Sequence, residues 1–134
     1  MSNIPKVQSL YAAFGRADVP AILELLAADV DWEYGSVENG VPWIKHVRGR
    51  EGAAGFFQAV GQHLDMHSFE PTVFLEAPNL VVALCNLEFT VRGSGRRHVE
   101  IDEPHIFRFD AAGRIVKFRH APDTYGQAMA YRGT

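Results

Sequence analysis

The stretch LVVALCNLEFTVRGSGRRHVEIDEPHIFRFDAAGRIVKFRHA, residues 80–121, decides the fold because it contains three extended segments separated by two short turns. Apolar and polar residues alternate along each segment with the period of two that is typical of β-strands. The turns, Gly93-Ser94-Gly95 and Asp110–Gly113, carry the glycine and aspartate residues that favour hairpins. We therefore predict three antiparallel strands, at residues 80–92, 96–109 and 114–121.

The residues before this stretch predict mainly helices. Apolar residues recur every three or four positions in three segments, which is the pattern of an amphipathic helix. Asp18 is a good N-cap for the second of these helices, and Pro20 fits its first turn. The predicted helices span residues 4–15, 18–26 and 50–65, with a strand at 30–34, a loop at 35–48, a further strand at 68–77 and a short last helix at 123–131.

Helices that precede a run of hairpin-linked strands imply an α+β domain, in which the helices cover one face of an antiparallel sheet. The 134 residues fit a single domain, residues 1–134, without repeats or linkers. Hydrophobic residues make up 47% and charged residues 22% of the chain, so global disorder is excluded.

Composition also limits the partners and the compartment. The net charge is −3 and no basic block exceeds Arg96-Arg97-His98, which argues against nucleic acid as a partner. The longest apolar run, Leu80–Cys85, is too short to cross a membrane, and the first ten residues lack the pattern of a secretory signal. The only cysteine, Cys85, excludes an intrachain disulfide. We expect a cytoplasmic protein that binds neither nucleic acid nor membrane.

Pairing the strands across the two turns predicts a polar cluster on the apolar face of the sheet. A three-residue first turn places Cys85 opposite Glu103 and Ala83 opposite His105, and the second hairpin brings His120 beside them. The same register pairs Leu87 with Ile101, Phe89 with Val99 and Phe107 with Val116, all on this inner face. The opposite face, with Arg96, His98, Glu100 and Asp102, is expected to be solvated, as are Asp29, Asp31 and Glu33 of the first strand.

A carboxylate beside two imidazoles suits acid–base chemistry. Burial of such groups without partners costs several kcal/mol, so Glu103, His105 and His120 must be paired with one another or wet. The charge of Glu103 and the effect of burial shift a histidine pKa in opposite directions, which favours proton transfer near neutral pH. The alternative is a hydrogen-bonded core network without chemistry.

Several aromatic residues are candidates for a pocket that binds a planar or hydrophobic ligand, although they are equally typical of an ordinary core. These candidates are Tyr11, Trp32, Tyr34, Trp43 and Phe56. Cys85 is expected beside them as a small buried residue and not as an activated thiolate. His63 and His67 have a spacing that suits a metal on a helix, but no third ligand is near, so we predict no metal and no cofactor.

Two longer stretches resemble a known family. They are LYAAFGRADVPAILELLAADVDWEY, residues 10–34, and HIFRFDAAGRIVKFRHAPDT, residues 105–124. Both are similar to the SnoaL-like branch of the nuclear transport factor 2 (NTF2) superfamily, which includes ketosteroid isomerase. The resemblance implies a cone-shaped NTF2-like fold, in which N-terminal helices pack on a curved, mixed and mainly antiparallel sheet. It also implies an apolar pocket and a homodimer joined through the sheet, where Val82, Leu84 and Ile106 are apolar residues of the outer face.

The resemblance also matches four residues to positions in members of the family. His105 matches a position that often holds histidine in SnoaL-like proteins, and Asp123 matches an aspartate that commonly follows the last strand. Tyr34 stands near the place of the general-base aspartate of ketosteroid isomerase, so the same steroid chemistry is not implied. His120 stands where many relatives carry glutamate.

These observations lead to two hypotheses of different classes. The first is an enzyme that needs no cofactor and performs isomerisation, cyclisation or elimination next to a carbonyl of a small apolar or cyclic ligand. In it, His105 and Asp123 transfer protons, and Glu103 or His120 orients the imidazole. The second is a non-catalytic protein that binds a small hydrophobic ligand or has an accessory role.

Overall fold

The computed structural model describes residues 1–134 as four helices and one six-stranded sheet. The helices are α1 (Ile4–Gly15), α2 (Val19–Glu24), α3 (Gly49–His63) and α4 (Thr124–Arg132). The strands are β1 (Leu26–Trp32), β2 (Val47–Arg48), β3 (Leu64–Ala77), β4 (Leu80–Val91), β5 (Arg97–Phe109) and β6 (Ile115–His120). None of the helices is long and apolar enough to cross a membrane.

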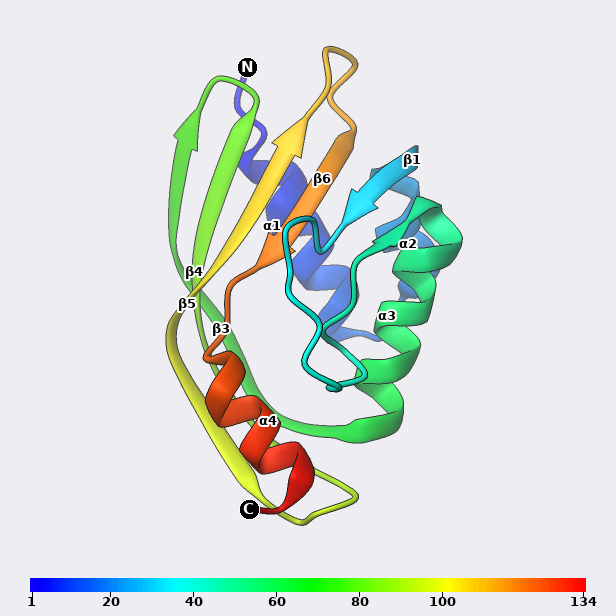
Figure 1. Cartoon of the computed structure of the whole chain (residues 1–134). Helices are drawn as coiled ribbons and strands as arrows, with labels where there is room; N and C mark the ends of the chain where they lie inside the picture. Colours follow the sequence, from blue (N-terminus) through cyan, green and yellow to red (C-terminus); the bar gives the residue numbers. More distant parts are fainter.

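The strand order in the sheet is β2-β1-β6-β5-β4-β3. Only β1 and β6 run parallel, and the other neighbours are antiparallel. Figure 1 shows the long strands β3, β4 and β5 curving along one side of the molecule, with α1 and α3 on the concave side and α4 against the lower half of β5. The predicted α+β class and the cone-shaped architecture are confirmed.

Local sequence explains where the helices begin. The Asp18 side chain accepts a hydrogen bond from the Ala21 amide at 3.2 Å, so it caps α2 as predicted. Asp123 caps α4 in the same way, through the Gly126 amide at 2.9 Å. Asn3 occupies the N-cap position of α1, but its side chain makes no capping bond. The core lies between the helices and the concave face of the sheet.

The predicted pairs Cys85–Glu103 and Ala83–His105 are confirmed, but the register changes beyond them. A β-bulge lies at Asp102, whose φ is +55° and whose N–H donates to Asn86 Oδ1 at 2.9 Å. Past the bulge, Leu87 pairs with Glu100 and Phe89 with His98, so the predicted pairs of Leu87 and Phe89 are wrong.

The bulge shifts the alternation of β5 by one residue. Residues before Asp102 that were expected to face the core therefore face solvent, and their neighbours face the core. Val99 and Ile101 are 54% and 69% exposed, whereas Glu100 is only 6% exposed, which is the reverse of the expectation. At the second hairpin Phe107 pairs with Phe118 and not with Val116, and His105 pairs with His120. The observed register therefore differs from the predicted one by two residues. Because side chains alternate with a period of two, the same residues of β6 still face inward.

Candidate functional site

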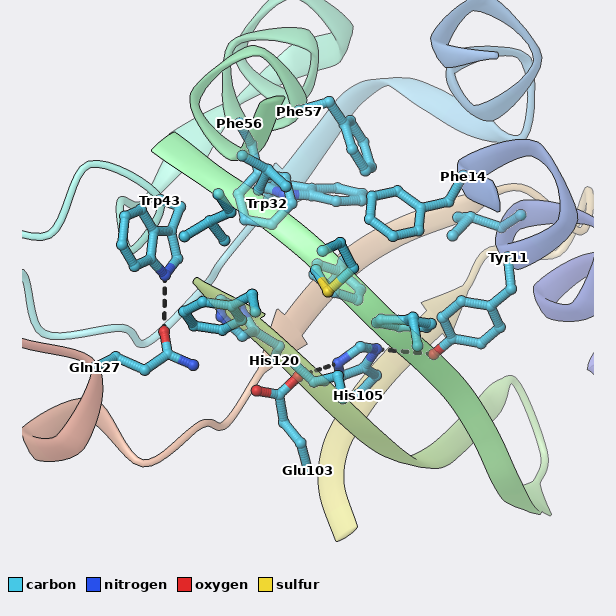
Figure 2. Close-up of a pocket in the computed structure, with 18 residues that line it drawn as sticks. Tyr11, Phe14, Trp32, Trp43, Phe56, Phe57, Glu103, His105, His120 and Gln127 are labelled. Atoms are coloured by element: carbon cyan, nitrogen blue, oxygen red, sulfur yellow. Dashed lines mark hydrogen bonds and ion pairs between the residues drawn. The ribbon is translucent and has the colours of Figure 1, made fainter. Parts of the chain in front are cut away.

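An apolar pocket lies between the helices and the concave face of the sheet. The space free of protein atoms inside it is about 630 Å³, a figure that includes its open mouth. Figure 2 shows the aromatic side chains around this space and the polar ones on one side of it. Fourteen of its eighteen lining residues are hydrophobic, and the other four are Glu103, His105, His120 and Gln127.

A chain of hydrogen bonds runs from α1 to β5 at the base of the pocket. The Tyr11 hydroxyl lies 2.8 Å from His105 Nδ1, and His105 Nε2 lies 2.6 Å from Glu103 Oε2 (Figure 2). Cys85 Sγ lies behind them, 3.6 Å from the Tyr11 hydroxyl. Both ring nitrogens of His105 are therefore held by the protein.

The direction of this chain follows from the protonation of its members. Burial raises the pKa of the Cys85 thiol to about 11, and burial also raises the pKa of the Tyr11 hydroxyl, so both keep their protons near neutral pH. The thiol then donates to the Tyr11 oxygen, the hydroxyl donates to His105 Nδ1, and Nε2–H donates to the Glu103 carboxylate. The arrangement resembles a hydroxyl–imidazole–carboxylate triad, in which Tyr11 supplies the hydroxyl and Glu103 supplies the carboxylate.

A second ion pair lies next to the chain. His120 Nδ1 is 2.7 Å from the Glu33 carboxylate, and the His120 amide donates to Glu33 Oε1 at 3.1 Å. Burial lowers the pKa of His120, but the charge and hydrogen bond of Glu33, with the charges of Glu103 and Glu100, outweigh it and raise the pKa. His120 is therefore favoured as an imidazolium. Its ring lines the pocket, 6.1 Å from the His105 ring between centroids.

The expectation that Glu33 is solvated is wrong, since its side chain is completely buried. Glu33 follows β1 directly and has a φ of +63°, so the chain turns there and the strict alternation of the strand ends. Its N–H donates to the Phe118 carbonyl, which holds the turned backbone against β6. The sequence carried no signal for this residue because alternation placed it on the outer side.

A second polar network includes two lining residues of the pocket, Trp43 and Gln127, and fixes α4. Trp43 Nε1 donates to Gln127 Oε1 at 2.7 Å, and Gln127 Nε2 donates to Glu100 at 3.1 Å. His98 and the Asp123 amide also contact the same Glu100 oxygen. Burial raises the pKa of Glu100, but these hydrogen bonds and the charge of His98 outweigh it and lower the pKa. Sequence reasoning missed both Gln127 and Glu100.

The structure brings most of the predicted site residues together. Glu103, His105 and His120 share the inner face, and four of the five aromatic candidates line the pocket, namely Tyr11, Trp32, Trp43 and Phe56. Cys85 does not line it but contacts Tyr11 and His105 from behind.

Two predicted site residues lie elsewhere. Asp123 is exposed and serves as the N-cap of α4. It is not among the residues that line the pocket. Tyr34 is half-buried outside the pocket, with Lys117 Nζ 5.6 Å from the centre of its ring. Tyr34 lies in the turn that begins at Glu33, and Asp123 lies at the start of α4.

No group of three or more histidine, cysteine, aspartate or glutamate side chains has the geometry to hold a metal ion. His67 Nε2 contacts the Thr90 hydroxyl at 2.7 Å, and the His63 ring packs beside Trp43 and Tyr131. The pair at residues 63 and 67 therefore has separate partners.

The fold and the pocket can now be compared with known proteins. The profile of the SnoaL-like domain matches residues 7–118, and the chain belongs to this family. An NTF2-like protein of unknown function from Burkholderia pseudomallei is 28% identical, with 98% of each chain covered and a TM-score of 0.85. No match was found among curated proteins.

Two other solved structures share the fold at lower identity. TerC, co-crystallised with polyporic acid, is 23% identical, with 97% of this chain and 98% of TerC covered and a TM-score of 0.83. A polyketide cyclase-like protein from Pseudomonas putida is 18% identical, with 97% of this chain and 98% of that protein covered and a TM-score of 0.77. At these identities the likeness concerns the fold alone.

Proposed function

We propose that the protein binds a small, largely apolar carbonyl compound and moves a proton next to the carbonyl without a cofactor, giving isomerisation, cyclisation or elimination. The observation that carries the proposal is the chain from Tyr11 through His105 to Glu103, which ends on an apolar pocket. A buried imidazole between a hydroxyl and a carboxylate is an arrangement that takes up and returns a proton.

The proton moves through Tyr11 in this proposal. As the Tyr11 oxygen accepts a proton from the carbon next to the carbonyl, its own hydroxyl proton passes to His105 Nδ1. The two transfers occur together because burial disfavours a free tyrosinate. The products are an enolate and an imidazolium, and the carboxylate of Glu103 stabilises the imidazolium. Return of the proton to a different carbon completes an isomerisation.

His120 supplies the second requirement of this chemistry, which is a donor for the enolate oxygen. Glu33 holds Nδ1, so the other ring nitrogen, Nε2, is left without a partner in the chain and can donate to a ligand in the pocket. A fixed, charged donor in a site that excludes water stabilises a developing oxyanion by several kcal/mol in typical enzymes. The ligand named for TerC and the cyclase-like neighbour support small-molecule chemistry on this fold.

Deuterium exchange tests the proposal without knowledge of the natural substrate. 1-Tetralone, a flat aromatic ketone with exchangeable protons beside its carbonyl, is incubated with the protein in D₂O and followed by proton NMR. We expect the protein to accelerate exchange of these protons with a bell-shaped pH profile, since one histidine must accept a proton and the other must keep one. Exchange at the buffer rate for 1-tetralone and related bound ketones would reject the catalytic proposal.

One observation favours the alternative of a non-catalytic binding protein. Both ring nitrogens of His105 are already hydrogen-bonded, which would also serve to hold Tyr11 as a fixed contact for a ligand. Binding of ketones with no acceleration of exchange at any pH would support this alternative. Acceleration that follows the two histidines would exclude it.

We also propose that the protein forms a homodimer through the outer face of the sheet. Val73 and Leu75 of β3 are exposed there and pair with Leu84 and Val82 of β4, which forms a continuous apolar patch with Ile106 of β5. We expect light scattering at micromolar concentration to give about twice the monomer mass, and Leu84→Lys to give the monomer. Val37→Lys, in an exposed loop, is the matched control and should leave the mass unchanged. A monomeric wild type would reject the dimer.

A further inference from the structure

Trp43 lines the pocket but belongs to a segment that has no regular secondary structure. Residues 33–46 join β1 to β2 without a helix or strand, yet Trp43 is only 2% exposed. Its ring meets Phe89 and Tyr131 edge to face, with 6.1 and 5.7 Å between centroids, and stacks on no neighbour. Because backbone hydrogen bonds of a helix or sheet do not hold this segment, the position of Trp43 depends on contacts from other elements.

The contacts that hold this segment come from α4. Every hydrogen bond that joins residues 35–45 to a distant part of the chain ends on that helix. These bonds are Trp43 Nε1 to Gln127 Oε1 at 2.7 Å, Asn39 Nδ2 to the Thr124 carbonyl at 3.2 Å, and Arg132 Nη2 to the Asn39 carbonyl at 3.3 Å. Only the first of them is buried, and only the first reaches a side chain that lines the pocket. Gln127 is therefore the direct link between α4 and Trp43.

Glu100 decides which end of the Gln127 amide faces Trp43. A glutamine side chain has an acceptor oxygen and a donor NH₂ group, and it can present either one to a neighbour. The buried Glu100 carboxylate lies 3.1 Å from Gln127 Nε2, and an ionised carboxylate can only accept. The NH₂ group must therefore face Glu100, which turns the Gln127 oxygen toward the indole N–H of Trp43.

We propose that Gln127 is a positioning residue, which is oriented by Glu100 and holds Trp43 in place, and that Trp43 held in this way limits the size of the ligand. Figure 2 shows Trp43 and Gln127 on one side of the pocket and Tyr11 on the other. Gln127 thus acts on the fit of the ligand and not on the proton transfer. The inference rests on the proposed ligand-binding function and adds a determinant of ligand size.

Nuclear magnetic resonance of the protein without ligand tests the positioning of Trp43. The chain has two tryptophans, so a nitrogen–proton spectrum shows two indole signals, and the one that is absent in Trp43→Phe belongs to Trp43. Gln127→Met keeps the length of the side chain but removes the acceptor. We expect the Trp43 signal to shift and its proton to exchange with water about threefold to tenfold faster, which is the effect of one hydrogen bond. An unchanged signal would overturn the proposal.

Gln127→Glu tests the role of Glu100 through a rescue that depends on pH. The carboxylate of Glu100 disfavours a second charge beside it, so it raises the pKa of the introduced carboxyl group. When protonated, that group can donate to Glu100 and accept from Trp43, as the amide does. We expect the Trp43 signal to resemble the wild type at about pH 5 and Gln127→Met at about pH 9. His98 contacts Glu100 and also titrates, so the wild type is recorded at both pH values as the reference. The same signal relative to this reference at both pH values would contradict the role of Glu100.

Relative affinity tests the limit on ligand size. Calorimetric titration compares 1-tetralone with a three-ring ketone, 3,4-dihydro-1(2H)-phenanthrenone. We expect Gln127→Met to raise the affinity for the three-ring ketone relative to 1-tetralone at least about threefold, because Trp43 without its hydrogen bond can move aside. In a Trp43→Phe background the same change should not alter the ratio further, since Gln127 acts through Trp43. Tyr125→Ala, at an exposed position of α4, is the control and should change neither the ratio nor the indole signal.

The outcomes separate this inference from the proposed function. An equal ratio in wild type and Gln127→Met, or an effect of Gln127→Met that persists without Trp43, would reject the size limit. Trp43→Phe alone should raise the ratio because its ring is smaller, and an unchanged ratio would reject the size limit even if Gln127→Met does not fold. Failure of both ketones to bind would reject the proposed ligand class, and the indole signal would still decide whether Gln127 positions Trp43. A shifted ratio without deuterium exchange would reject only the catalysis.

Discussion

His105→Gln is expected to slow deuterium exchange of 1-tetralone by about 10²–10⁴-fold, which is the usual contribution of a general acid–base group. The glutamine amide can still donate to Glu103 and accept from Tyr11, so the two neighbours of His105 keep partners. It cannot take up a proton near neutral pH, so only the proton transfer is lost. Exchange is measured by NMR at saturating ketone, and chemical unfolding of the same sample shows that the fold is retained.

His67→Gln is the matched control, because His67 is exposed, lies outside the pocket and hydrogen-bonds to Thr90. It should exchange the ketone at the wild-type rate. Retention of the full rate in His105→Gln would show that the imidazole does not carry the proton and would leave it the role of a structural contact.

Glu33→Ala is expected to lower the free energy of unfolding by about 3–5 kcal/mol, the typical cost when one partner of a buried ion pair is removed. The change leaves the His120 ring buried without its counter-charge and removes the acceptor of the His120 amide. Urea unfolding measures the difference. Asp29→Ala, an exposed carboxylate on the same strand, is the control and should change the stability by less than about 0.5 kcal/mol.

The stability difference between wild type and Glu33→Ala should depend on pH with a definite sign. Glu33 raises the pKa of His120 in the folded protein above its ordinary value of 6.5. A group with a raised folded pKa contributes its full stabilisation below the unfolded pKa and loses it as the pH rises through the folded pKa. The difference should therefore be largest below pH 6.5 and shrink at higher pH. A difference that grows with pH would contradict the ion pair.

The fold was predictable because the elements have strong local signals. The alternation in residues 80–121 and the helical spacing of residues 4–15 are long enough to outweigh local exceptions. The pairing of Cys85 with Glu103 was also correct, but through two compensating differences. The first turn sets the strands one residue away from the predicted register, and the bulge at Asp102 restores it.

The parts of the site that could not be predicted depend on backbone conformations that a side-chain pattern does not record. Both Glu33 and Asp102 have positive φ, at +63° and +55°, and each reverses the side to which nearby residues point. Glu33 and Glu100 were for this reason expected on the surface, although both are buried with partners. Gln127 is buried through the contact of α4 with Trp43, which joins residues 84 positions apart.

The bulge at Asp102 divides β5 into two parts that have different structural roles. Residues 97–101 anchor α4 through Glu100, whereas residues 103–109 form the floor that holds Glu103 and His105. Substitutions in one part need not disturb the side-chain order of the other, because the break in register lies between them. During evolution the anchoring of α4 and the reactive groups in the pocket could thus diversify independently along a single strand.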